Sequence, residues 1–102
     1  MNERLRGYLG LAHRGRKALI GKAIYEEWSR RKIFAIVLAN DAQSTTQDKL
    51  VARAKTTNIP VYFAGSKAEL GQALGLREVS SIAISDKGLA TQIIAVIKEE
   101  LQ

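Results

Sequence analysis

The residues best suited to bind a ligand form a short basic segment near the start of the chain. Arg14, Arg16 and Lys17 lie close together, and an apolar run then leads to Gly21. If a helix begins after Gly21, the glycine permits a tight turn and the first N–H groups of the helix point outward without intrahelical partners. A helix start of this kind attracts anions, and nearby cations strengthen the attraction. The segment therefore predicts a site for phosphate or for acceptor-rich base edges, with a solvated strand-to-helix corner as the alternative.

The net charge of the chain favours a polyanionic partner. Sixteen lysines and arginines face ten acids, which gives a net charge of +6 and a pI near 9.9. Residues 1–32 carry nine of these cations and three acids, so the remainder of the chain is close to neutral. Such a balance suits nucleic acid or an acidic membrane surface. The asymmetry places the predicted contact surface in the first third of the chain.

Few residues suit catalysis or metal binding. His13 is the single histidine and there is no cysteine, which excludes a histidine pair, a thiolate metal site and a cysteine nucleophile. Asp41 and Asp86 each follow a predicted strand, where open α/β sheets bind ligands, and could converge on a metal. The favoured interpretation is that each one caps the turn or helix that follows. No catalytic residue, metal or cofactor is therefore predicted, and the chain is not expected to be an enzyme.

The glycine and aromatic patterns do not match a nucleotide-binding motif. Neither the dinucleotide fingerprint nor a Walker pattern fits the spacing of Gly7, Gly10, Gly15 and Gly21. Trp28 follows Ile24 at helical spacing, which is more typical of a core residue than of a platform for base stacking. The three tyrosines are not interleaved with basic residues as they are in an RNP motif.

Length and composition predict one domain covering residues 1–102. Hydrophobic residues make up 46% of the chain and charged residues 25%, as in an ordinary soluble globular protein. No apolar run approaches the roughly 18 residues of a membrane span, and the N-terminus lacks the apolar core of a signal peptide. We therefore expect a cytoplasmic protein that is not embedded in a membrane.

Hydrophobic periodicity predicts alternating helices and strands. The predicted helices cover residues 2–12, 22–31, 44–57 and 66–74, and a last helix follows residue 88 with an apolar side of Leu89, Ile93, Val96, Ile97 and Leu101. The predicted strands cover residues 18–20, 33–39, 61–64 and 81–85, and those at 33–39 and 61–64 read as buried strands. This alternation predicts an α/β fold, a three-layer α/β/α sandwich with a mixed, mostly parallel sheet of about four strands.

Local signals predict where two of the helices begin and end. Ser44 or Thr45 is a suitable N-cap for the third helix. Ser66 and Glu69 form a capping-box pattern at the start of the fourth helix, and Gly75 is placed to end it.

Four stretches, taken in order, resemble one known family. They are LGLAHRGRK at 9–17, RKIFAIVLANDA at 31–42 with Gly21 upstream, NIPVYFAGSKAELGQALG at 58–75, and SSIAISDKG at 80–88. The ordered set resembles the ribosomal protein L-seven-Ae / L-thirty-e family, and within it a small bacterial YlxQ-like branch. The resemblance extends from about Tyr8 to Leu101. It implies an α/β/α sandwich that recognises kink-turn RNA.

The resemblance also implies which residues contact the RNA. In this family the helix opened by the glycine enters the major-groove side of the RNA at tandem sheared G·A pairs, and a loop before the last strand packs on extruded bases. The glycine matches Gly21, and the loop matches residues 76–80. The RNA-binding residues implied in this chain are Arg14, Arg16, Lys17, Gly21, Lys22, Ala23, Ile24, Arg77, Val79 and Ser80.

Three positions depart from the best RNA binders of the family. Those proteins carry Asn-Glu and a following lysine where this chain has Ala23, Ile24 and Glu27. The two apolar side chains cannot hydrogen-bond to base edges, and each good bidentate base contact is worth about 1–3 kcal/mol. The sequence therefore predicts a non-catalytic, ribosomal-protein-like RNA-binding protein. Its expected partner is ribosomal RNA or another kink-turn RNA, and the ribosome is a candidate partner. The alternative is a protein-interaction module that has lost specific RNA readout and exposes Ile24 to its partner.

Overall fold

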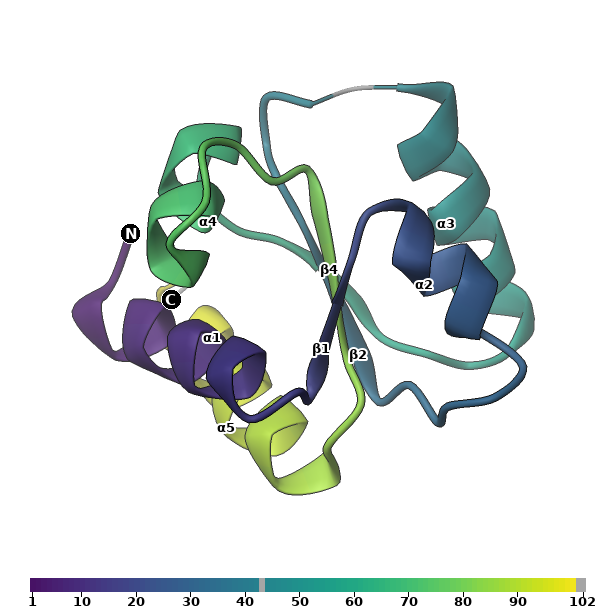
Figure 1. Cartoon of the computed structure of the whole chain (residues 1–102), viewed down its shortest axis with the longest axis horizontal. Helices are drawn as coiled ribbons and strands as arrows, with labels where there is room; N and C mark the ends of the chain where they lie inside the picture. Colours follow the sequence, from purple (N-terminus) through teal and green to yellow (C-terminus); the bar gives the residue numbers. More distant parts are fainter. Residues whose placement is uncertain (43, 101–102) are drawn as a thin grey trace.

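A computed structural model describes residues 1–42 and 44–100. Within them the helices are α1 (Glu3–Arg14), α2 (Lys22–Glu27), α3 (Thr45–Thr56), α4 (Lys67–Leu74) and α5 (Lys87–Glu100). The strands are β1 (Ala18–Ile20), β2 (Ala35–Leu38), β3 (Val61–Phe63) and β4 (Ser81–Ile84). One four-stranded sheet separates α2 and α3 from α1, α4 and α5 (Figure 1). The predicted three-layer α/β/α sandwich is confirmed.

The sheet is mixed, but the expectation that it is mostly parallel is wrong. Its strand order is β1-β4-β2-β3, and only β2 and β3 pair in parallel. β4 lies between β1 and β2 and runs antiparallel to both. Leu38 at the end of β2 is opposite Ser81 at the start of β4, because α4 and its following loop stay at the end of the sheet where β2 finishes. The chain therefore enters β4 from that end and runs back between β1 and β2, antiparallel to both of them.

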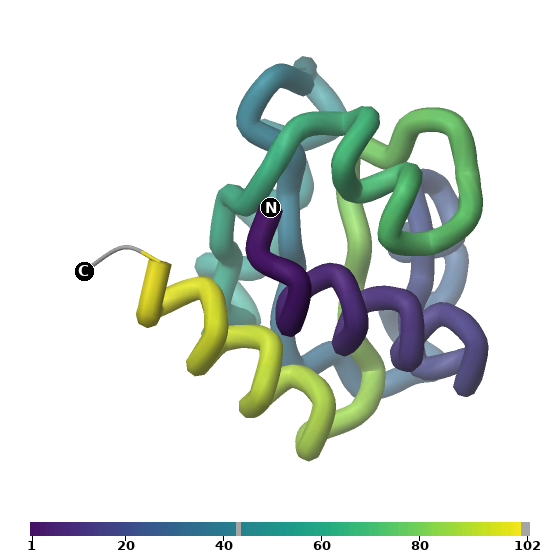
Figure 2. Tube along the Cα trace, turned by 90° about the vertical axis from the view of Figure 1, so that its left-hand side faces the viewer, coloured from purple at the N-terminus to yellow at the C-terminus, as the bar shows by residue number. Residues whose placement is uncertain are grey.

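The core has two parts, one on each face of the sheet. One part packs β2 and β4 against α1, α4 and α5, and the other packs them against α2 and α3. Figure 2 shows α1 and α5 side by side, and Arg4 of α1 donates a hydrogen bond to the carboxylate of Glu99 in α5 at 2.9 Å. Every residue of β2 and β4 is buried. These two strands therefore form the rigid centre on which the surface loops are carried.

The prediction that residues 61–64 form a buried strand is wrong for β3. β3 is an edge strand, and 51% of Phe63 is exposed. Val61 packs against the core part beneath α2 and α3, and Phe63 extends beyond it. An apolar, β-branched run predicts only that a strand forms. The position of that strand in the sheet decides whether both of the strand's faces are covered.

The predicted helix ends are largely confirmed. The Ser44 hydroxyl accepts a hydrogen bond from the Gln47 N–H, and Ser66 with Glu69 forms the expected capping box. Gly75 ends α4 in a left-handed conformation. The second helix is shorter than expected and ends at Glu27, because the chain continues in turns from there.

The last helix presents its predicted apolar side to the core. Ile93, Val96 and Ile97 are buried and Leu89 is half-buried, and the predicted Leu101 lies outside the described residues. None of the helices in the described part of the chain is long and apolar enough to cross a membrane.

Candidate nucleic-acid interface

The basic segment forms a tight turn between α1 and β1. Arg14 is the last residue of α1, and the side chains of Arg14, Arg16 and Lys17 are all exposed. Arg16 adopts a left-handed backbone conformation with φ of 58°, which is uncommon for a residue other than glycine. The Lys17 N–H donates to the carbonyl of Ala12 at 2.7 Å, which closes the turn onto the end of the helix. We call these three cationic residues, Arg14, Arg16 and Lys17, the basic turn.

Arg31 holds the basic turn in place. Its guanidinium donates one hydrogen bond to the backbone carbonyl of Arg16 at 2.6 Å and another to the hydroxyl of Ser85 at 2.9 Å. The Ser85 N–H in turn donates to the carbonyl of Lys17 at 2.8 Å. These bonds support a backbone conformation that costs on the order of 1 kcal/mol or more for a residue with a side chain. Arg31 therefore positions the turn, and its own donors are partly used within the protein.

We expect Arg31→Ala to weaken binding of a polyanion by more than its loss of one charge explains. The matched control is Lys32→Ala, which removes one exposed cation that lies outside the basic turn. Arg31→Lys keeps the charge but lacks the planar guanidinium, whose Nη2 donates both hydrogen bonds. If the turn geometry matters, Arg31→Lys resembles Arg31→Ala in a filter-binding or anisotropy titration with RNA. Equal losses for Arg31→Ala and Lys32→Ala, with Arg31→Lys unchanged, would contradict a positioning role.

Gly21 turns the chain from β1 into α2. Its φ of 57° and ψ of −124° lie in a region that essentially only glycine occupies, and its N–H donates to the Ser81 carbonyl at 3.2 Å. The helix that follows has six residues, so its dipole is small and adds little attraction for anions. Lys22 is exposed beside the turn. At this end of β1 the attraction for phosphate therefore depends on Lys22 more than on the helix start.

The two parts of the predicted site lie at opposite ends of β1. The basic turn precedes the strand and Gly21 follows it, and a three-residue strand spans roughly 10 Å. β1 is an edge strand of the sheet, so both ends border the same rim of the molecule (Figure 1). The structure thus separates residues that are close in sequence, at a spacing that a strand of nucleic acid can bridge.

A hollow of about 490 Å³ lies beside Gly21. It is lined by Gly21, Lys22 and Tyr25 on one side and by Ser44, Thr46, Gln47, Ser80 and Ser81 on the other. The Tyr25 hydroxyl donates to the Thr46 carbonyl at 3.0 Å and so joins α2 to the start of α3. We call this space the Gly21 hollow. Of the residues predicted from the sequence, it brings together Gly21, Lys22 and Ser80.

The loop between α4 and β4 forms part of the same surface. A Cβ on Gly71 would lie 2.4 Å from the carbonyl oxygen of Arg77, so glycine is needed for this close approach. The Val79 side chain is buried, and the Val79 N–H donates to the carbonyl of Lys67 at 3.0 Å. Val79 therefore anchors the loop and does not offer a contact surface, whereas Arg77 and Ser80 are exposed.

The α2 residues Ala23 and Ile24 are less accessible than predicted from the sequence. Ile24 is fully buried and packs with Leu19, Leu38 and Leu50, while Ala23 is half-buried. Ile24 cannot be a side-chain contact to RNA in this conformation. The alternative that Ile24 is exposed to a protein partner is wrong for the same reason.

The residues considered for catalysis have structural roles. The Asp41 carboxylate accepts a hydrogen bond from the Lys67 N–H at the start of α4, and the Asp86 carboxylate accepts one from the Leu89 N–H in α5, both at 2.8 Å. The capping interpretation is therefore confirmed for Asp86, which caps the helix that follows it. For Asp41 it is wrong, because Asp41 caps α4 and not the turn or helix that follows it; the Asn40 N–H donates to the Gly65 carbonyl at 2.8 Å and so brings the end of β2 beside the start of α4. His13 lies in the last turn of α1. Among residues 1–42 and 44–100, no three histidine or carboxylate side chains are grouped so as to hold a metal.

Trp28 is half-buried against the core beneath α2 and α3, as the sequence predicts. The Arg53 guanidinium lies 4.7 Å from the centre of its ring, an arrangement typical of a cation–π contact. This face of the indole is therefore covered.

Gln47 is a site residue that was not predicted from the sequence. It is 4% exposed, and its side-chain N–H group donates to the carbonyls of Ser80 at 3.1 Å and Ala39 at 3.4 Å. It thereby ties the start of α3 to the end of β2 and to the loop that borders the Gly21 hollow. The available signal is its spacing from Leu50 and Ala54, which puts a polar residue on the buried face of the helix.

Comparisons with known proteins agree with this architecture. The chain is 29% identical over 90 residues to the RNA-binding protein YlxQ of Bacillus subtilis, covering 87% of this chain and 90% of that protein. It is 34% identical over 73 residues to the large ribosomal subunit protein eL30 of Sulfurisphaera tokodaii, covering 70% and 68% of the two chains.

Solved structures share the fold. A protein of unknown function from Bacillus halodurans superposes with a TM-score of 0.87 at 28% identity, covering 95% of this chain and 99% of that one. The 15.5kD RNA binding protein of Giardia lamblia superposes with a TM-score of 0.75 at 19% identity, covering 97% and 92%. The sequence profile of the ribosomal protein L7Ae/L30e/S12e/Gadd45 family matches residues 3–94. The chain therefore belongs to this family.

Proposed function

We propose that this protein is a non-catalytic RNA-binding protein that holds structured RNA of the kink-turn type along the rim formed by β1. The observation that carries the proposal is the placement of exposed cations at both ends of this strand, with the basic turn at one end and Lys22 at the other. Two relatives named as an RNA-binding protein and a ribosomal protein support it. The proposed partner is ribosomal RNA or another kink-turn RNA in the cytoplasm.

Contacts to the phosphate backbone supply most of the affinity in this proposal. The basic turn contributes three exposed cations and Lys22 a fourth, and Arg77 adds a fifth from the loop before β4. Phosphates along one strand of a nucleic acid are spaced closely enough for several of them to lie within the roughly 10 Å between the two ends of β1. Binding of this kind releases counterions and weakens steeply as salt is added.

Contacts to bases come from the residues that line the Gly21 hollow and not from Ala23 or Ile24. Ala23 and the buried Ile24 have no side-chain donor or acceptor, so α2 cannot read base edges through these two positions. The Gly21 hollow offers Lys22, Tyr25 and Ser80 to a base that leaves the helical stack, as the resemblance implies for the loop before β4. Recognition therefore relies on backbone shape and on an extruded base.

The test is a titration of the protein with a kink-turn RNA and with a duplex of the same length that lacks the kink, each at two salt concentrations. We expect tighter binding to the kink-turn RNA and a steep salt dependence for both. Equal, salt-sensitive affinities would refute kink-turn recognition and leave a general RNA-binding protein. The absence of binding to both RNAs would overturn the proposed function.

A further inference from the structure

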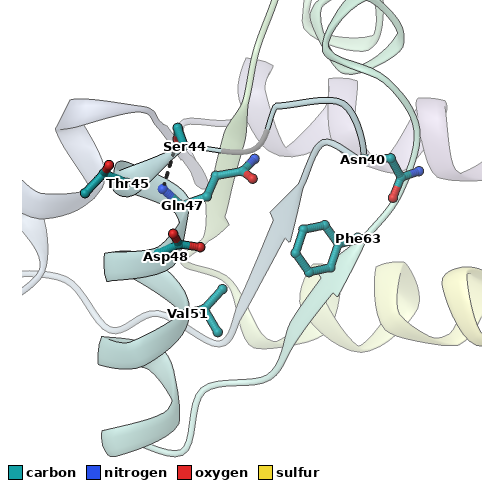
Figure 3. Close-up of a pocket in the computed structure, with 7 residues that line it drawn as sticks. All are labelled: Asn40, Ser44, Thr45, Gln47, Asp48, Val51 and Phe63. Carbon is teal, nitrogen blue, oxygen red and sulfur yellow. Dashed lines mark hydrogen bonds between the residues drawn. The ribbon is translucent and has the colours of Figure 1, made fainter.

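A second hollow lies on the other side of the start of α3, between this helix and the exposed end of β3. Its volume is about 590 Å³, and the residues that line it include Asn40, Gln47, Asp48 and Phe63 (Figure 3). We call it the Phe63 hollow. It shares Ser44 and Gln47 with the Gly21 hollow, so the two spaces flank one helix start.

The aromatic ring of Phe63 forms one wall of this hollow. Half of Phe63 is exposed, although it is a large apolar residue, because β3 is an edge strand. In Figure 3 the ring lies across the space from α3, with Val51 and Asp48 on the opposite side. A π-face left open in this way is a platform on which a planar base can stack.

Two of the polar residues in this lining, Gln47 and Asp48, carry acceptor oxygens. Gln47 is buried and its amide extends from α3 toward the side on which Asn40 and Phe63 lie (Figure 3). The amide nitrogen of Gln47 donates to the carbonyls of Ala39 and Ser80, and these two bonds fix the orientation of the amide. The amide oxygen therefore points away from these two carbonyls. Within residues 1–42 and 44–100 no group donates to this oxygen.

Asp48 adds a carboxylate to the same lining, and among the described lining residues there is no lysine or arginine. This carboxylate repels phosphate and favours a ligand that presents N–H donors to it. The Watson–Crick edge of guanine carries two neighbouring donors, its ring N–H and its exocyclic amino group. Two parallel hydrogen bonds to the oxygens of one carboxylate match this edge, whereas adenine offers only an amino group there.

We propose that the Phe63 hollow binds the base of an unpaired guanine, stacked on Phe63 and paired through its Watson–Crick edge with Asp48, with Gln47 as a further acceptor. The guanine comes from an RNA strand that leaves the Gly21 hollow and passes over the start of α3. This source of the base rests on the proposed function. A free guanine nucleoside has the same base, and the experiment separates the two sources.

The first arm uses no RNA. Isotopically labelled protein is titrated with guanosine and followed by amide NMR, with inosine, adenosine and ribose 5-phosphate as probes. We expect shifts at Asn40, Asp48 and Phe63 with guanosine, binding about tenfold weaker for inosine because it lacks the exocyclic amino group, and no shifts there with ribose 5-phosphate. Equal responses to guanosine and adenosine, or no response to guanosine, would overturn the proposal.

Two variants separate the stacking and pairing contributions. Phe63→Leu keeps an apolar side chain but removes the aromatic face, and Asp48→Asn keeps the shape of the side chain but removes one acceptor and the charge. Each should weaken guanosine binding about tenfold, while Lys49→Ala, on the same exposed turn of α3, leaves it unchanged. Thermal melting confirms that each variant is folded. Unchanged guanosine affinity in both folded variants would overturn the site.

The second arm attaches a single-stranded tail to the kink-turn RNA and compares one unpaired guanosine with one unpaired adenosine in it. We expect the guanosine tail to bind about fivefold or more tightly, an advantage that Asp48→Asn abolishes without changing affinity for the untailed RNA. If guanosine binds in the first arm but the guanosine tail binds no more tightly than the adenosine tail, RNA is not the source of the base. The Phe63 hollow would then be a site for a free nucleoside. Loss of all RNA binding with guanosine shifts intact would overturn the proposed function alone.

Discussion

Replacing Arg14, Arg16 and Lys17 together by alanine should abolish most of the affinity of this protein for RNA. Each cation that neutralises a phosphate contributes about 0.9 to the slope of log K against log salt for a duplex, so the slope should fall by about 2.7 if all three make such contacts. All three side chains are exposed, and the turn that carries them is held by hydrogen bonds of the backbone and of Arg31. The change should therefore act on binding and leave the fold intact.

The measurement is the affinity for one RNA at several salt concentrations, by fluorescence anisotropy. The matched control replaces Lys55, Lys87 and Lys98 by alanine. These three side chains are also exposed, and their replacement lowers the net charge by the same amount. If the basic turn is the contact, the control changes the slope far less than the triple variant. Similar slopes for the two variants would show that only the overall charge matters, and would move the RNA-binding surface elsewhere.

Replacing Ile24 by alanine should destabilise the protein by about 2–5 kcal/mol. The side chain is fully buried among Leu19, Leu38 and Leu50, so truncation leaves a cavity that these neighbours fill only in part. The same substitution should have little direct effect on RNA contacts, since Ile24 offers no surface. Urea denaturation gives the free energy of unfolding, and RNA binding is measured below the unfolding transition.

Ala23→Ser is the matched control in the same helix, at a half-buried position, and should cost far less stability than Ile24→Ala. It adds a hydroxyl beside the Gly21 hollow, where it tests whether α2 can regain a contact to RNA. An Ile24→Ala variant as stable as the unsubstituted protein would contradict the packing described above.

Local sequence was sufficient to predict most of the helices and strands. The Ser66 and Glu69 capping box, the left-handed Gly75 and the buried strand β2 each depend on residues within a few positions of one another. Such features are set by short-range hydrogen bonds, by backbone sterics and by the period of the apolar residues. The same reasoning placed Gly21 at a sharp turn, and its positive φ is consistent with that.

The candidate site was predicted only in part, because its parts meet through strand order. The amino-acid sequence alone shows that cations gather in the first third of the chain, and it predicts that Gly21 precedes a helix. The insertion of β4 between β1 and β2, which brings Ser80 beside Gly21 and leaves the basic turn at the far end of β1, depends on how the strands pair in three dimensions. Likewise, the exposure of Phe63 and the role of Gln47 depend on which strand lies at the edge and which carbonyls face α3. These are contacts between residues distant in sequence, and no local pattern encodes them.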